Sequence, residues 1–189
     1  MIGDDVLRRL PDLESSRLIL RKVRAGDLQA VHAYASNPAV TEHLVWEPHR
    51  TLEDTRRYVS EILRRYRDGE LAPWAIELRA GGEMIGTCGF VTWYRHDARA
   101  EIAYVLAQPY WNRGYATEAV RAAIDFGFAS MELNRIEGRC MVENVASARV
   151  LEKLGMRYEG AMRQQIRAKG RFRDVRLYAI LRGDRQSSA

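Results

Sequence analysis

The residues best suited to binding a phosphate run from Tyr110 to Glu118 and read Tyr-Trp-Asn-Arg-Gly-Tyr-Ala-Thr-Glu. They precede the clearest amphipathic helical pattern in the chain, which begins at Ala116. A loop entering a helix presents unpaired backbone N–H groups with the positive end of the helix dipole behind them, and such a site binds phosphate. Gly114 allows close backbone approach or a positive φ, and Arg113 can add a charged contact. A glycine turn before an ordinary capped helix is the alternative interpretation.

Two further residues could move protons. Glu101 interrupts an otherwise apolar strand pattern, so it is a candidate general base, with a salt-bridged strand glutamate as the alternative. Ser147 shares helical spacing with Val150 and Leu154, which turns its hydroxyl toward the inward face of an expected helix. Asn144 precedes that helix, and Asn is among the preferred N-cap residues.

The elements that must position these residues alternate between strands and helices. The pattern predicts strands at 18–20, 74–79, 84–93, 99–106, 135–142, 158–167 and 172–181. It predicts a helix capped by Asp27, a helix after Thr51 with Asp54 as a capping box, a helix from Ala116, and a helix from Asn144 to Gly155. This order indicates a mixed α/β fold with a central twisted mixed sheet of about seven strands flanked by four helices. The expected domain spans residues 14–182, with an N-terminal extension (1–13) and a C-terminal tail (183–189).

Composition excludes several classes of protein. The 189 residues are 47% hydrophobic and 29% charged, which is typical of a globular domain and unlike a disordered chain. No apolar run reaches bilayer length and the N-terminus lacks a secretory pattern, so we expect no membrane and a cytoplasmic location. Cys88 and Cys140 and the four histidines show no metal-ligand spacing, which predicts buried thiols, no disulfide and no metal. The net charge of +5 suits phosphate-bearing partners or simply a solvated basic surface.

Five motifs, in order, resemble those of the GNAT acetyltransferases, and more closely the RimJ/RimL-type branch whose named members acetylate ribosomal-protein N-termini. The likeness covers roughly residues 14–182. The loop Arg113 to Ala119 resembles the coenzyme A pyrophosphate loop of that family. The other four motifs resemble the family's opening strand, two central strands, the helix after the fifth strand and the closing hairpin, and they lie at 16–21, 85–90 with 100–104, 143–156 and 170–174.

The resemblance implies acetyl-CoA as co-substrate and roles for particular residues. Glu101 would lie beside the thioester as general base, and Ser147 would steady or protonate the leaving thiolate. Backbone groups on one strand would pair with the pantetheine amides, while the loop and the helix start would contact the rest of the cofactor. The implied cofactor-binding residues are Tyr104, Val105, Leu106, Asn112, Arg113, Gly114, Tyr115, Ala116, Thr117, Asn144 and Ser147.

Two positions depart from the family pattern. Trp111 stands where the broad family has Gln or Arg, and Leu151 stands where many members carry a tyrosine general acid. That role cannot be carried over to Leu151, so another group protonates the thiolate or the thiolate leaves unprotonated.

The acceptor is expected to be an amine. Only a neutral amine attacks a thioester, and an α-amine with a pKa of about 7.7–8.0 is far more often neutral at pH 7 than a lysine near 10.4. The resemblance implies a protein N-terminus as acceptor, possible ribosome association, and the homodimer common in this branch, which no residue here demonstrates.

An acetyltransferase for a small amino compound stays open. So does a non-catalytic ribosome- or RNA-binding module that uses the basic residues around the last hairpin. Four aromatic residues are expected either to pack in the core or to line the acceptor cleft: Trp46, Trp74, Trp93 and Tyr94.

Overall fold

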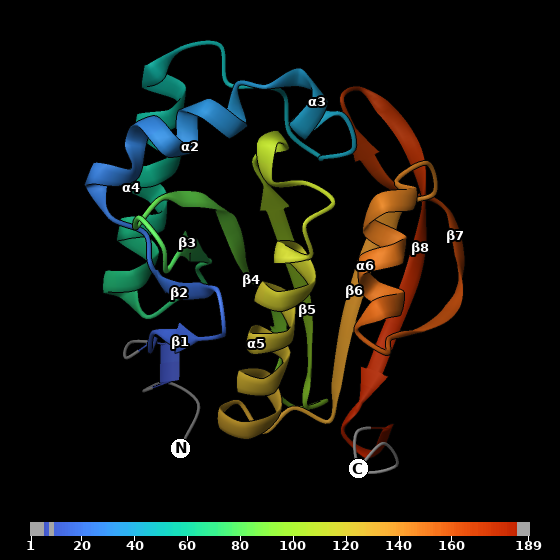
Figure 1. Ribbon diagram of the computed structural model, residues 1–189. Coiled ribbons are helices and arrows are strands. Elements are labelled where there is room, and N and C mark those ends of the chain that lie inside the picture. The colour runs from blue at the N-terminus through green and yellow to red at the C-terminus, as the bar shows by residue number, and fades with distance from the viewer. Residues whose placement is uncertain (1–5, 8–9, 185–189) are drawn as a thin grey trace.

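One twisted β-sheet of eight strands runs through the computed structural model, which describes residues 6–7 and 10–184 (Figure 1). Most of the expected N-terminal extension and C-terminal tail lies outside these ranges. The strand order is β1-β2-β3-β4-β5-β6-β8-β7, and every neighbouring pair is antiparallel except β5 and β6. The strands are β1 (Leu13–Glu14), β2 (Leu18–Lys22), β3 (Trp74–Leu78), β4 (Met84–Tyr94), β5 (Arg99–Leu106), β6 (Arg135–Met141), β7 (Arg157–Ala168) and β8 (Arg171–Leu181).

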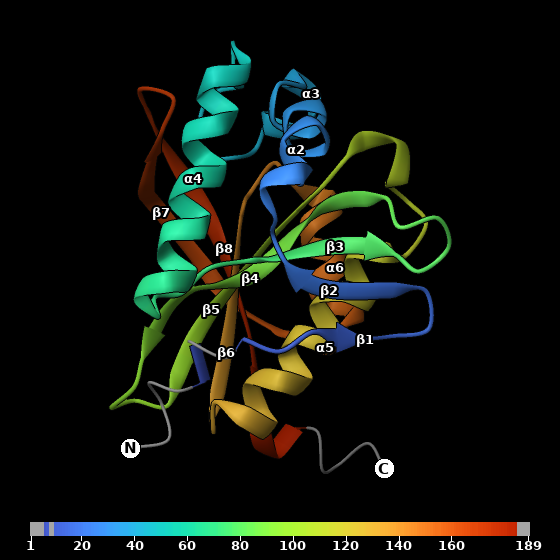
Figure 2. The ribbon, with the colours of Figure 1, turned by 90° about the vertical axis from the view of Figure 1, so that its left-hand side faces the viewer.

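Helices cover both faces of this sheet. Figures 1 and 2 together show α5 and α6 on one face and α4 on the other, with α2 and α3 at the same end as the start of α4. The α-helices are α2 (Leu28–Ala35), α3 (Pro38–Thr41), α4 (Leu52–Asp68), α5 (Tyr115–Ser130) and α6 (Val145–Lys153). The mixed α/β fold class is therefore confirmed. The described chain has one strand and one helix more than expected, because the two-residue β1 and the one-turn α3 are too short to produce a periodic pattern.

Local signals explain where the long helices begin and how closely they pack. Thr51 and Asp54 form the predicted capping box at the start of α4, each side chain accepting from the other residue's backbone N–H. In α5, Gly127 lets the helix approach the sheet, since a Cβ there would lie 2.7 Å from Cζ of Phe90. The predicted periodicity of α5 thus corresponds to its buried face against the sheet.

The expected capping role of Asp27 is wrong in detail. Asp27 directly precedes α2, but its side chain makes no cap hydrogen bond to that helix. Its carboxylate instead accepts two 2.8 Å bonds from the buried guanidinium of Arg21, which also pairs with Glu77. These bonds hold the pKa of Asp27 below its usual value against the opposing effect of burial. A buried guanidinium is a stronger partner for the carboxylate than the partly solvated helix end.

The feature that creates space for a site is the divergence of β5 from β6. Their parallel pairing ends at Ile102 and Gly138, although β5 continues to Leu106 and β6 to Met141. Beside this point, β4 carries a register shift that leaves Val91 without a partner on β5. Bulges increase the local twist and often lie next to active sites. The last four residues of β5 therefore have a strand partner on only one side.

Candidate active site

A cavity of about 520 Å³ lies at the divergence of β5 and β6. This volume falls within the range typical of ligand sites. Residues from α4, the segment before it, both diverging strands and α6 contribute to its walls. Among the predicted site residues, the cavity brings together Glu101, Tyr104, Val105, Asn144 and Ser147.

The free edge of β5 exposes the backbone groups of alternate residues. Ala107 donates to the carbonyl of Ile85 of β4, and the Val105 carbonyl lies so close to Gly86 of the same strand that a Cβ at Gly86 would sit 2.2 Å from it. Backbone groups alternate in direction along a strand, so those of Tyr104 and Leu106 point to the open side. Three residues were expected to pair with a cofactor through their backbone groups. Val105 directs its backbone groups to β4, whereas Tyr104 and Leu106 direct theirs to the open side of β5.

The predicted phosphate loop has the geometry of an anion site. Asn112 and Gly114 both have positive φ values, 60° and 80°, and Gly114 is the N-cap of α5. The first intrahelical bond runs from Glu118 to the Gly114 carbonyl, so the N–H groups of Tyr115, Ala116 and Thr117 belong to the open first turn. The structure thus places these residues at a helix start, as the sequence predicted.

Sequence reasoning missed Arg17, which supports this loop. Its guanidinium donates to the carbonyl of Arg113 at 3.0 Å, pairs with Glu118, and lies over the Tyr115 ring at 4.4 Å. Glu118 also accepts from the Arg17 backbone N–H and from the hydroxyl of Ser15. Arg17 lies in the opening-strand motif and Glu118 lies in the loop motif, but only the tertiary fold shows that the two meet.

Trp111 also contributes to the open edge. Its indole N–H donates to the Leu106 carbonyl at 2.8 Å, although 39% of the residue is exposed. A carbonyl oxygen has two lone pairs, so one remains for a ligand. The departure from the family pattern at this position therefore ties the loop to the end of β5.

Ser147 lies at the start of α6 within a small hydrogen-bonded group. Its backbone N–H donates to Asn144 Oδ1 at 3.0 Å, which confirms Asn144 as the N-cap. The Tyr104 hydroxyl lies 2.8 Å from Ser147 Oγ and 3.2 Å from the Ser147 carbonyl oxygen, and it can donate its one proton to either acceptor. Burial raises the pKa of Tyr104, so its hydroxyl stays protonated. Leu151, where many family members carry a tyrosine, is buried against Gly138.

Glu101 lies on the other face of β5, in an ion pair with Arg139 of β6. The guanidinium binds both carboxylate oxygens, with Nε 2.9 Å from Oε1 and a terminal nitrogen on Oε2. The side chain of Glu101 is only 12% exposed and lines the cavity. A carboxylate offers about four lone-pair positions, so the two bonds to Arg139 leave room for a further donor. The salt-bridged glutamate considered as an alternative is therefore present, within the cavity wall.

The other aromatic and sulfur-containing residues divide between core and cavity. Trp46 lines the cavity, whereas Trp74 is buried and donates to the Pro11 carbonyl. Trp93 and Tyr94 stack with arginines at the far end of β4. Both thiols are free and buried, and burial raises the pKa of Cys88 and Cys140. Neither thiol therefore resembles an activated nucleophile.

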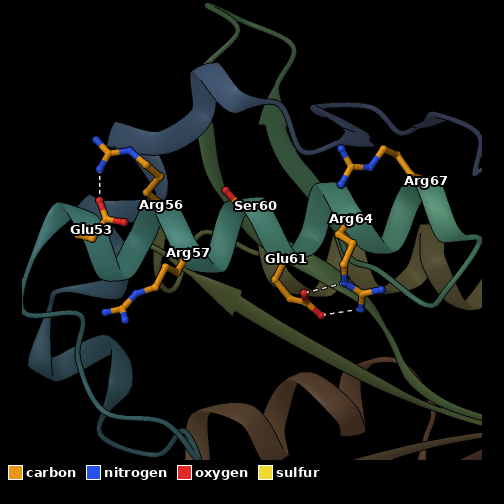
Figure 3. Close-up of a pocket in the computed structure, with 7 residues that line it drawn as sticks. All are labelled: Glu53, Arg56, Arg57, Ser60, Glu61, Arg64 and Arg67. Carbon is orange, nitrogen blue, oxygen red and sulfur yellow. Dashed lines mark hydrogen bonds and ion pairs between the residues drawn. The ribbon is translucent and has the colours of Figure 1, made fainter.

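A second depression, on the outer surface of α4, does not form a site. Figure 3 shows its seven lining residues, all from this one helix, so no second element closes it. Its charges are largely neutralised within the helix, as in the pairs of Arg56 with Glu53 and of Arg64 with Glu61. Exposed pairs of this kind are typical of a solvated helix face and contribute little stability.

Two classes of feature are absent from residues 6–7 and 10–184. No three His, Cys, Asp or Glu side chains gather there as a metal-ligand set. None of the described helices is long and apolar enough to cross a membrane.

Comparison with known proteins defines the family. The model of the GNAT acetyltransferase domain matches residues 17–157, and the chain belongs to this family of N-acetyltransferases, whose fold uses acetyl-CoA. An uncharacterized N-acetyltransferase of Bacillus licheniformis, p20, is 36% identical over 170 residues, which cover 90% of this chain and 96% of that protein. A GNAT-family acetyltransferase structure from Bacillus anthracis has a TM-score of 0.81 at 34% identity, covering 90% of this chain and 98% of the other.

More distant relatives differ in their acceptors. RimL, a ribosomal L7/L12 α-N-protein acetyltransferase solved in complex with coenzyme A, has a TM-score of 0.80 at 24% identity, with 90% of this chain and 98% of that chain covered. A spermidine N(1)-acetyltransferase of Vibrio cholerae is 23% identical over 88% of this chain and 94% of its own length. The comparisons thus show the family, but they do not identify the acceptor, which has to be inferred from the chemistry of the site.

Proposed function

We propose that this enzyme transfers acetyl from acetyl-CoA directly to the α-amine of a protein N-terminus, of the ribosomal-protein type, in the cytosol. One observation carries the proposal: the free edge of β5 begins beside a carboxylate, Glu101, on one face of the strand, and a serine hydroxyl, Ser147, meets Tyr104 on the other face. Amine deprotonation and thiolate departure each need one of these groups. The likeness to RimL supports the acceptor class.

The residues present fit acetyl-CoA along its length. The open first turn of α5 after Gly114 suits a pyrophosphate, with Arg113 beside it. The backbone groups of Tyr104 and Leu106 face the open side of β5, where pantetheine amides would bind as an added strand does. The cofactor supplies an acetyl thioester, and its reactive end would lie between Glu101 and Ser147.

The chain's own groups then move two protons. Glu101 accepts a proton from the attacking amine, directly or through a water, on a lone pair that Arg139 leaves free. As the new carbon–nitrogen bond forms and the carbon–sulfur bond breaks, Ser147 donates its hydroxyl proton to the departing sulfur. Ser147 then regains a proton from solvent and Glu101 releases the amine proton to solvent, which restores both residues. Direct transfer agrees with the raised pKa values of both thiols, which provide no ready thiolate to carry the acetyl group.

Tyr104 orients Ser147 for this step. A hydroxyl has one proton, so a bond donated by Tyr104 to Ser147 Oγ leaves the serine proton free to point at the sulfur. Leu151 of α6 lacks a hydroxyl, but Tyr104 of β5 places its own hydroxyl against the same helix. The positioning of Ser147 therefore comes from β5, where its backbone also faces the cofactor.

A double-mutant cycle tests this coupling. Tyr104→Phe is expected to lower kcat about 3- to 10-fold, the effect of one neutral hydrogen bond, with the KM for acetyl-CoA unchanged. Ser147→Ala is expected to lower kcat at least 100-fold, since it removes the proton donor. In the Ser147→Ala enzyme, adding Tyr104→Phe should have no further effect. Tyr158→Phe, at a tyrosine that is 55% exposed on β7, is the control. Additive losses would show that Tyr104 acts independently of Ser147.

The function itself is tested by calorimetric titration with acetyl-CoA, followed by coenzyme A release in the presence of peptides with free N-termini. One-to-one binding and release that requires the free α-amine would support the proposal. Release with a small amine but with no peptide would move the acceptor to the small amino compounds. An absence of binding at millimolar acetyl-CoA would overturn the proposal and favour a ribosome- or RNA-binding module. Two of the basic residues for that module are already engaged, Lys169 with the Thr41 carbonyl and Arg173 with Glu143.

A further inference from the structure

The walls of the cavity on the α4 side are mainly apolar and aromatic. This side is formed by the segment before α4, by α4 itself, by the segment that follows α4 and by β4, and it lies across the sheet from α6. The side chains concerned are Val45, Trp46, Tyr58, Ile62, Leu71 and Val91. Trp46 and Tyr58 are both held against His49, with ring centroids 5.4 and 5.7 Å away. An acceptor that enters from this side meets an aromatic wall.

The charges around this space are balanced. Two carboxylates line the cavity, and each is held by arginine among the described residues. Glu101 is bound by Arg139, and Glu61 accepts 2.9 Å bonds from both Arg64 and Arg65. Arg65 and Arg139 also line the cavity, so two guanidiniums face two carboxylates. His43 is the remaining ionisable side chain of the wall, apart from tyrosines and the buried Cys140.

A polyamine or an aminoglycoside needs a carboxylate for each additional ammonium that enters a cleft. Here the two carboxylates already share their charge with arginines, and a second ammonium would approach Arg65 or Arg139 as a like charge. An acceptor with a single amine on an apolar group meets no such penalty, because it brings no second ammonium. Its apolar group can also pack against the aromatic wall. Burial of one large apolar side chain favours binding by roughly 10- to 100-fold.

We infer that the acceptor is a primary monoamine carried on an apolar or aromatic body, and not a polycation. This inference rests on the proposed function, since it names the kind of amine that the same site acetylates. The same chemistry is offered by a peptide whose first residue is apolar and by a free apolar amine.

Four acceptors at equal concentration distinguish the cases: a peptide beginning with Phe, the same peptide beginning with Lys, phenylalanine amide, and spermidine. We expect kcat/KM for the Phe peptide or for phenylalanine amide to exceed that for the Lys peptide and for spermidine at least 10-fold. A preference for the Phe peptide over the amide identifies a protein N-terminus as the source, and the reverse identifies a small amine. Equal or faster turnover of spermidine would overturn the inference, as would turnover of none of the four.

Two sets of variants connect the preference to the residues. Trp46→Ala should reduce the advantage of the Phe peptide about 10-fold without changing the Kd of acetyl-CoA, and Trp46→Phe should restore most of it. Replacing both Arg64 and Arg65 by Gln frees Glu61 and should raise spermidine turnover. Acetyl-CoA binding, measured separately, separates the two possible failures. Normal binding with a polyamine preference overturns this inference and the proposed acceptor but leaves the acetyl transfer from acetyl-CoA standing, whereas absent binding overturns the acetyl transfer itself.

Discussion

Gly114→Glu is expected to abolish acetyl-CoA binding while the protein stays folded. The new carboxylate would lie at the helix start where the pyrophosphate is proposed to bind. Two like charges about 4 Å apart repel by roughly 4 kcal/mol at an effective dielectric constant of 20, which corresponds to about a thousandfold loss of affinity. The measurement is calorimetric titration of the variant with acetyl-CoA.

A matched control separates charge from backbone strain. Gly170, in the turn between β7 and β8, has a φ of 76°, close to the 80° of Gly114, and a Cβ added there would have nothing within 4 Å. Gly170→Glu therefore carries the same left-handed strain and the same charge, far from the α5 start. It should lose stability to a similar degree and bind acetyl-CoA normally. Normal binding by Gly114→Glu would exclude the loop from the cofactor site.

Glu101→Gln is expected to lower kcat by about 100- to 10,000-fold at neutral pH, the usual contribution of a general base. The loss should be greatest below the pKa of the acceptor amine, where most of the amine is protonated and depends on the enzyme for deprotonation. Activity should partly recover as the pH rises past about 8 for an α-amine, but only near pH 10 for a lysine. The pH–rate profile of this variant therefore also reports which kind of amine is acetylated.

Glu137→Gln is the control for this substitution. Glu137 is the register partner of Glu101 on β6, is ion-paired with Arg135 and Arg99, and has a similar side-chain exposure, 16% against 12%. It does not line the cavity. Loss of an equivalent ion pair should therefore leave kcat within about twofold of the native value. Equal effects of the two substitutions would assign Glu101 a structural role.

Much of the fold could be predicted because its signals are local. The capping box at Thr51, the periodicity of α5 and the N-cap at Asn144 each depend on residues within a few positions of one another. The same holds for the predicted phosphate loop, where a glycine before a helical pattern indicates either close backbone approach or a positive φ, and Gly114 has the positive φ.

Other features could not be predicted because they arise between distant segments. Arg139 meets Glu101 only through the register of two parallel strands, and Arg17 meets Glu118 only when the opening strand packs beside α5. The direction of the Val105 backbone depends on the pairing of β4 with β5, which residue types do not reveal. Candidate site residues could therefore be proposed one by one from the sequence, but their partners could not.

The early end of the pairing between β5 and β6 has a thermodynamic consequence. Four residue pairs join the two halves of the sheet, and beyond them no strand among residues 6–7 and 10–184 completes the edge of β5. Under the proposed function, acetyl-CoA supplies the missing hydrogen bonds and becomes part of the folded architecture. Its concentration then sets the folding equilibrium as well as the reaction rate, adding about 2.7 kcal/mol to the free energy of unfolding at a hundred times its Kd. An enzyme with this sheet would be most resistant to unfolding when its acetyl donor is abundant.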